Sequence, residues 1–98
     1  MSEQEIEQAI QVKNLNAPRL THEIINDRIA SAEYYVFPNT TLTVCCLTLS
    51  NGFNVTGQSA PENPENFDAE IGRKIAFENA RDKIWMLEGY LLKSKLAG

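Results

Sequence analysis

Two β-prone runs meet at an Asn-Gly pair within residues 40–59, whose sequence is TTLTVCCLTLSNGFNVTGQS. Asn-Gly is the dipeptide best suited to the two positive φ angles of a type I′ turn. With Asn51-Gly52 as a two-residue loop, residues 40–49 and 53–59 form an antiparallel hairpin. In this register one apolar face of the hairpin consists of Leu42, Val44, Cys46, Phe53 and Val55.

The two cysteines, Cys45 and Cys46, are adjacent in this hairpin. Successive side chains of a strand point to opposite faces, so the register predicts that Cys46 is buried and Cys45 is partly exposed. An extended vicinal pair does not bring its Cβ atoms to the about 3.8 Å that a disulfide needs. The one histidine, His22, is distant in sequence. We therefore expect free thiols, no metal site and no cofactor.

Two short helices are predicted before the hairpin. The first lies in an acidic N-terminal segment, residues 1–14, and Pro18 ends it because the residue before a proline is pushed out of the helical region. Thr21 can cap the second helix, which we expect to extend to about Ala32. His22, in its first turn, is expected to point to solvent. Residues 15–98 are interpreted as a single domain.

The second predicted helix leads into a third β-prone segment. The buried side of this helix is expected to consist of Ile24, Ile25 and Ile29. Residues 34–37, Tyr-Tyr-Val-Phe, are typical of a short strand at a sheet edge or of an extended entry into the sheet. In the first case the sheet would have three strands.

A long helix is predicted after the linker of residues 60–64. Pro64 or Asn66 can start it, and Asp68 and Glu70 suit its positive end. No helix-breaking residue follows until Gly89, so the helix is expected from about residue 65 to at least 88. The predicted fold class is α+β: an antiparallel hairpin or three-stranded sheet packed on a long C-terminal helix.

At about 100° per residue, this helix has two apolar sides. The first consists of Phe67, Ile71, Ile75, Trp85 and Met86. The second consists of Ala69, Gly72, Ala76, Ala80, Leu87 and Leu91, and its small residues would allow another backbone to come close. The hairpin can cover one side, but a chain of 98 residues has no obvious second cover. We expect the second side to form a homo-oligomer interface. The alternative is that the N-terminal segment folds back over it.

A charged strip lies between the two apolar sides, and it consists of Glu70, Arg73, Lys74, Phe77, Arg81 and Glu88. One interpretation is a solvated face of ion pairs, because Glu70 and Lys74 have i,i+4 spacing. The other is that two guanidinium groups flank one ring, a combination that suits phosphate or carboxylate groups and a stacked base. The candidate ligand-binding residues are therefore Arg73, Lys74, Phe77 and Arg81, for a small anionic or nucleotide ligand at a subunit interface.

Charge and composition argue against several classes of function. With 9 Lys and Arg against 13 Asp and Glu, the net charge of -4 opposes general nucleic-acid binding. No apolar run approaches the about 20 residues of a membrane span. The acidic N-terminus lacks the basic region of a signal peptide. Neither a Gly-rich phosphate loop nor a buried carboxylate pair is evident, so we expect no enzymatic activity.

Four blocks of the sequence stand out together: residues 15–21 (LNAPRLT), 46–60 (CLTLSNGFNVTGQSA), 66–76 (NFDAEIGRKIA) and 84–92 (IWMLEGYLL). These blocks resemble a family of small tailed-bacteriophage and prophage proteins of unassigned activity. The resemblance covers about residues 15 to 92. It implies a virus-encoded accessory protein that acts in the cytoplasm of the infected bacterium. It transfers no catalytic or binding residue.

The sequence favours two possible functions. The first is a non-enzymatic homo-oligomer that binds a host or phage protein during infection. The alternative is a counter-defence protein that sequesters a small anionic or nucleotide signal at a subunit interface, through the charged strip.

Overall fold

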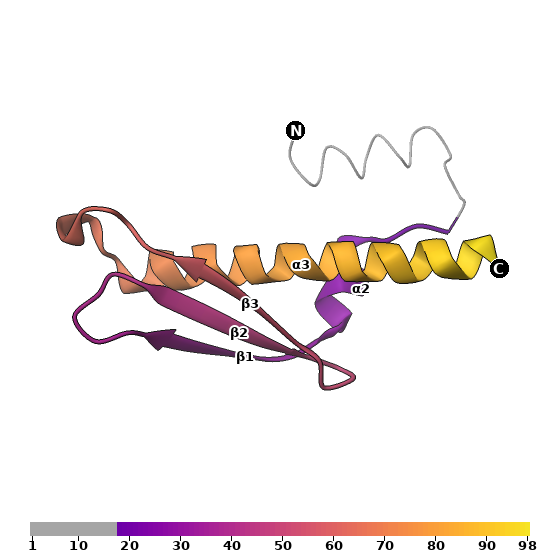
Figure 1. Cartoon of the computed structure of the whole chain (residues 1–98), viewed down its shortest axis with the longest axis horizontal. Helices are drawn as coiled ribbons and strands as arrows, with labels where there is room; N and C mark the ends of the chain where they lie inside the picture. Colours follow the sequence, from indigo (N-terminus) through magenta and orange to yellow (C-terminus); the bar gives the residue numbers. More distant parts are fainter. Residues whose placement is uncertain (1–17) are drawn as a thin grey trace.

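The computed structural model describes residues 18–98, in which a three-stranded antiparallel sheet packs against one long helix (Figure 1). The elements are α2 (His22–Asp27), β1 (Ile29–Val36), β2 (Thr43–Leu49), β3 (Asn54–Ser59), the 3-10 helix η1 (Pro64–Asn66) and α3 (Ala69–Ala97). The strand order is β1-β2-β3. The predicted α+β class is confirmed, with the third strand present. The predicted acidic segment of residues 1–14, with its short helix, lies outside the described residues.

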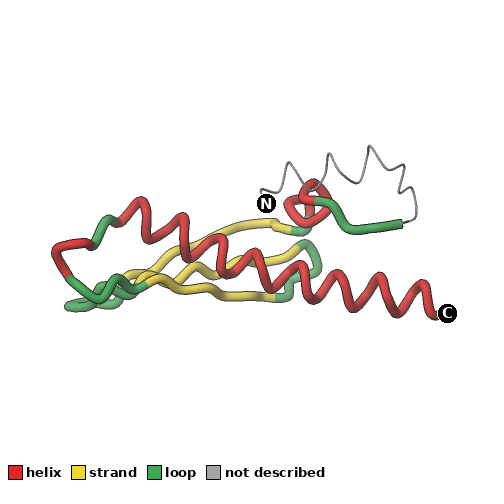
Figure 2. The backbone as a smooth tube through the Cα atoms, turned by 90° about the horizontal axis from the view of Figure 1, so that it is seen from above, coloured by secondary structure: helices red, strands yellow, loops and turns green. Residues whose placement is uncertain are grey.

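The helix α3 is much longer than the strands beneath it. Its 29 residues span about 43 Å, whereas the six residues of β3 span about 20 Å. In Figure 2, α3 crosses the strands obliquely and continues well beyond them. Asp68 caps its start by accepting a hydrogen bond from the Ile71 N–H (3.0 Å). The helix therefore begins after η1 rather than at residue 65, and it passes through Gly89 to Ala97.

The hairpin between β2 and β3 forms as predicted, but its register is shifted by one residue. The Leu49 N–H donates to the Phe53 carbonyl and the Gly52 N–H donates to the Leu49 carbonyl, both at 2.8 Å. The loop therefore has three residues, and of these only Gly52 has a positive φ, at 90°. This geometry is a tight turn followed by a glycine bulge, which uses Asn-Gly as readily as a type I′ turn does.

A shift of one residue exchanges the two faces of β2 relative to β3, so that the odd-numbered residues of β2 join Val55 on the buried face. The buried face consists of Thr43, Cys45, Leu47, Leu49, Val55 and Gly57. The predicted apolar face is therefore wrong, except for Val55. Cys45 is fully buried and Cys46 is partly exposed, which is the reverse of the expectation.

The contact between α3 and the sheet is made by small residues. A Cβ atom added to Gly57 would lie inside van der Waals distance of the Ala76 carbonyl oxygen and the Ala80 backbone nitrogen. Gly72 makes a looser approach, because a Cβ atom added to it would lie 3.1 Å from the Thr43 side-chain oxygen. Gly72, Ala76 and Ala80 are buried beneath this chain's own sheet, so the small-residue side of α3 faces the strands.

The two apolar sides of α3 are thus exchanged relative to the prediction. Ile71, Ile75 and Met86, which were expected to cover the hairpin, are 56%, 46% and 72% exposed. The small-residue side faces the sheet because glycine and alanine bring the helix close enough to bury Leu47 and Ile84 completely. Of the larger-residue side, Ile71, Ile75 and Met86 remain uncovered within residues 18–98, whereas Trp85 packs against the core.

The helix α2 is shorter than predicted. Thr21 caps it by accepting a hydrogen bond from the Ile24 N–H (3.2 Å), and Ile25 is its buried residue. The chain leaves the helix at Arg28 because Ile29 and the residues after it pair with β2. The β-prone residues 34–36 thus belong to a strand that begins five residues before them, and Phe37 follows its end.

The Gly57→Ala substitution tests the close approach of β3 to α3. The added methyl group meets helix backbone, which cannot move aside as a side chain can, so we expect a loss of about 1–3 kcal/mol or more in the free energy of unfolding. Chemical denaturation measures this loss. Gln58→Ala is the control, because its side chain is exposed and should change stability by less than about 0.5 kcal/mol. Equal stability of the two variants would contradict the contact.

Candidate ligand-binding groove

The sheet is only partly covered by α3. The helix packs chiefly on β2 and β3, and every residue of β1 from Ala30 to Val36 is exposed. A groove of about 380 Å³ therefore opens between β1 and α3. It is lined by Tyr34, Glu70, Arg73, Lys74, Phe77 and Glu78.

Three of the four predicted ligand-binding residues line this groove: Arg73, Lys74 and Phe77. They come from successive turns of α3, so the helix holds two cations beside one ring. Lys74 also lies 3.5 Å from the Glu70 carboxylate, and both side chains are largely exposed. An exposed pair of this kind contributes only about 0.3–0.5 kcal/mol, so an anionic ligand can compete for the lysine.

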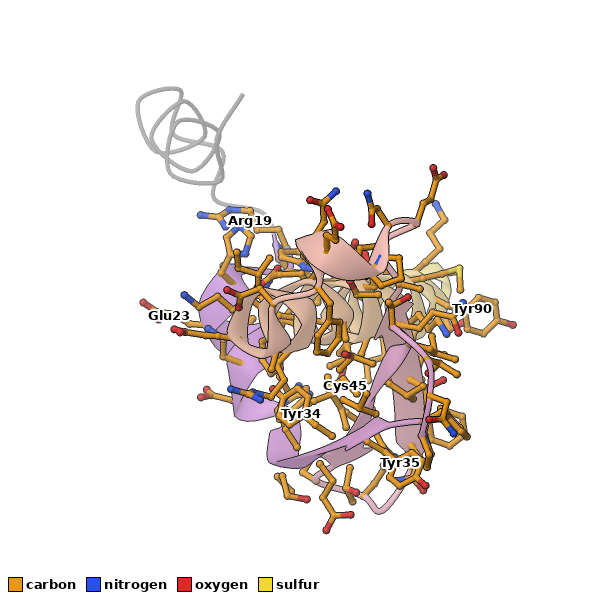
Figure 3. All side chains as sticks on the ribbon, turned by 90° about the vertical axis from the view of Figure 1, so that its left-hand side faces the viewer. Arg19, Glu23, Tyr34, Tyr35, Cys45 and Tyr90 are labelled. Atoms are coloured by element: carbon orange, nitrogen blue, oxygen red, sulfur yellow. The ribbon has the colours of Figure 1, made fainter. Side chains whose placement is uncertain are left out.

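Tyr34, on the opposite wall, was missed by the sequence analysis. It is paired with Cys45 across β1 and β2, so its side chain lies on the helix side of the sheet. Figure 3 shows Tyr34 and Cys45 on this side and Tyr35 on the far side. The groove thus has a second aromatic ring facing Phe77 and Arg73.

Burial controls the titration of Tyr34 and Cys45. It raises the pKa of the Tyr34 hydroxyl, the neighbouring Cys45 raises it further, and Arg73 acts in the opposite direction. Burial also raises the pKa of the Cys45 thiol, against a smaller lowering effect of its hydrogen bond with Tyr34. At neutral pH both groups are therefore protonated, and Cys45 is a poor nucleophile.

Arg81 does not belong to the groove. It is only 5% exposed, and its Nε donates a hydrogen bond to Asn26 Oδ1 (2.9 Å). Its Nη2 lies 3.3 Å from His22 Nδ1. Eight residues at about 100° each turn Arg81 about 80° away from Arg73 around the helix, which directs it toward α2. The prediction that both arginines flank Phe77 is wrong, because Arg81 fastens α2 to α3.

His22 also departs from the sequence prediction. Its ring makes an edge contact with Trp85 on α3, with 4.8 Å between ring centroids and 75° between planes. It is therefore half-buried between the two helices instead of pointing to solvent. Nearby, Arg28 Nε donates to Glu88 Oε1 (2.6 Å), so Glu88 of the charged strip also joins the α2 region to α3.

A second, apolar groove lies where the tip of the hairpin meets the overhanging half of α3. Its volume is about 440 Å³, and it contains two of the predicted interface residues, Leu87 and Leu91. Phe53, Met86 and Tyr90 complete its exposed apolar rim. The remaining predicted interface residue, Ala69, lies exposed at the first turn of α3.

Two general features of residues 18–98 bear on function. No group of three or more His, Cys, Asp or Glu residues in this part of the chain is arranged to hold a metal ion. No helix in the same range is long and apolar enough to cross a membrane.

A family model describes most of the chain. The model of the phage protein (N4 Gp49/phage Sf6 gene 66) family matches residues 20–96. The chain belongs to this family. The resemblance drawn from the sequence blocks is thereby confirmed, and a phage accessory protein is the class of function that membership supports. Comparisons with curated proteins and with solved structures give no match.

Two arginine variants test whether Arg81 holds α2 against α3 while Arg73 only lines the groove. Arg81→Met removes a buried charged donor from Asn26, so we expect the free energy of unfolding to fall by about 1.5–3 kcal/mol. Arg73→Met removes an exposed side chain and should change it by less than about 0.5 kcal/mol. Denaturant titration of both variants measures the difference. If Arg81→Met is as stable as Arg73→Met, then Arg81 is not the anchor of α2.

Proposed function

We propose that this protein is a non-enzymatic phage accessory protein that acts by binding, as a homo-oligomer, in the cytoplasm of the infected bacterium. The observation that carries the proposal is the uncovered apolar surface around Phe53, Met86, Tyr90 and Leu91, called here the overhang patch. These four side chains are more than half exposed, and they line one continuous groove.

The overhang patch has the character of a protein-binding surface. Apolar side chains that are scattered singly are normal on a monomer, but contiguous exposed groups mark contact sites. Tyr and Met are also among the residues enriched in the cores of interfaces. The partner we propose is a host or phage protein with a complementary apolar segment.

Binding also suits the titratable groups better than catalysis does. Cys45, the buried thiol beneath the groove, has a raised pKa, whereas a catalytic cysteine needs a lowered one. Arg81, the most buried cation among the described residues, is engaged in holding α2. The groups that remain available around the groove are suited to recognition.

The proposal predicts a solution mass above that of one 11.0 kDa chain, measured by light scattering after size exclusion. It also predicts that the Met86→Glu/Tyr90→Glu variant loses a protein that wild type recovers from infected cells. Both side chains are more than 70% exposed, so folding should be unaffected.

Lys83→Glu is the control for this capture experiment, because it changes the net charge by the same amount one turn from Met86, at a side chain that does not line the groove of the overhang patch. It should recover the protein as wild type does. A monomeric wild-type chain, or equal recovery with both variants, would contradict the proposal.

A second candidate function is favoured by the groove itself. Tyr34 and Phe77 provide rings on opposite walls, and Arg73 and Lys74 provide positive charge between them. Aromatic rings stack on bases, and guanidinium groups bind phosphate through paired hydrogen bonds. The groove thus suits sequestration of a small anionic or nucleotide signal, a counter-defence role. Arg81 has no part in this version of the site.

Thermal unfolding with a panel of nucleotides tests the second candidate. A ligand present at 100 times its dissociation constant should stabilise the protein by about 2.7 kcal/mol. Arg73→Ala and Phe77→Ala should abolish the stabilisation. Lys83→Ala removes the same charge as Arg73→Ala from outside the groove and should keep it. A shift that survives Arg73→Ala would place the ligand elsewhere.

A further inference from the structure

The two edges of the sheet differ in how far α3 covers them. At the β3 edge, the Asn79 side chain of α3 donates a hydrogen bond to the Gln58 carbonyl (2.8 Å), and α3 packs along the strand. At the β1 edge, residues 30–36 are all exposed and α3 lies away from them. The β1 edge is therefore the one that is open to another strand.

The hydrogen-bond pattern identifies the backbone groups on this edge. The Phe37 N–H donates to the Leu42 carbonyl (3.2 Å), which sets the alternation along β1. Odd-numbered residues from Ser31 to Phe37 then bond to β2, and Ala32, Tyr34 and Val36 direct their N–H and C=O groups outward. An adjacent strand would satisfy these three residues at once.

Residues 31–36 lack the features that usually prevent strands from pairing at an edge. Natural sheets protect edges with lysine, proline, bulges or a covering segment. The stretch Ser-Ala-Glu-Tyr-Tyr-Val contains neither lysine nor proline, and the one bulge of β1 lies before it, between Ile29 and Ser31. Five of its six residues are uncharged.

We propose that a second copy of this chain pairs with β1 in antiparallel fashion, with the two-fold axis at Tyr34. This inference rests on the proposed homo-oligomer and names its interface. In this register Tyr34 faces Tyr34 of the second copy, and Ala32 faces Val36 of the second copy. These are the residues whose backbone groups point outward, so the pairing satisfies them symmetrically.

The charges of the strand fit this register. Glu33, the one charged residue of β1, faces Tyr35 of the second copy on the outer side of the sheet, so no like charges meet. The axis is perpendicular to the sheet, which places both α3 helices on the same side. Each helix lies over the two strands farthest from the axis, so the joined strands meet without a helix between them.

The pairing also accounts for the groove having a helix along one side only. Tyr34 is at once a wall of the groove and the residue on the axis. The second copy brings its own groove alongside the first. The helix-side surface of β1, which α3 leaves uncovered, becomes the floor between two helices.

Two substitutions at Tyr35 test the proposed register, and both should change the stability of the monomer equally. Tyr35→Glu places a second acid opposite Glu33 of the other copy, and Tyr35→Lys places an opposite charge there. Both variants lose the same edge contact with Phe37 in their own chain. By light scattering and sedimentation, we expect the glutamate variant to raise the dimer dissociation constant at least tenfold and the lysine variant to leave it unchanged or lower it.

Cysteine cross-linking tests the same register directly. Facing residues on a hydrogen-bonded antiparallel pair have Cα atoms about 5.5 Å apart, within disulfide range. Ala32→Cys/Val36→Cys should therefore form a covalent dimer under mild oxidation. Either single variant should not, because its cysteine faces no cysteine in the other copy. Circular dichroism and unfolding curves confirm that each variant is folded.

The outcomes distinguish this interface from the proposed function. A wild-type dimer that responds to neither Tyr35 variant and gives no cross-link would overturn the β1 pairing while the homo-oligomer stands. A wild-type monomer at high concentration would overturn both. Loss of the dimer in Tyr35→Glu but not Tyr35→Lys, with cross-linking only in the double variant, supports the pairing.

Discussion

The backbone contact between Gly57 and the turn of α3 that holds Ala76 and Ala80 determines the rest of the arrangement. Because no side chain separates strand and helix at this point, α3 lies tightly over β3 and β2. A single helix cannot lie that close to one edge of a three-stranded sheet and also cover the other. The open groove beside β1 and the exposed Ile71 and Ile75 are both consequences of this placement.

The sequence predicted the elements well and their mutual orientation poorly. The hairpin, the edge strand and the long helix all follow from local signals such as Asn51-Gly52 and the alternation around it. The register does not, because a two-residue and a three-residue loop use the same dipeptide, and the difference exchanges Cys45 with Cys46. Gly57 does not decide between the registers, because it lies on the same face as Val55 in both; in the observed register the β2 residues beside them are Cys45 and Leu47.

The candidate site was predicted to a similar extent. Arg73, Lys74 and Phe77 could be grouped from helical spacing alone, and they share one groove. Arg81 could not be separated from them by spacing, since its partner Asn26 is 55 residues away in the sequence. Tyr34 can be assigned to the groove only from the pairing of β1 with β2, which no local sequence pattern predicts. Long-range contacts thus decide which members of a helical strip remain available to a ligand.

Three surfaces are left uncovered by residues 18–98: the β1 edge, the groove beside it and the overhang patch. A chain of this length buries too small a share of its surface to cover a sheet and a 29-residue helix on every side. Pairing through β1 would use backbone groups and leave Met86 and Tyr90 on the overhang untouched. Under the two proposals, the protein assembles with itself at the β1 edge and binds a different partner at the overhang patch, so each contact can be altered without the other.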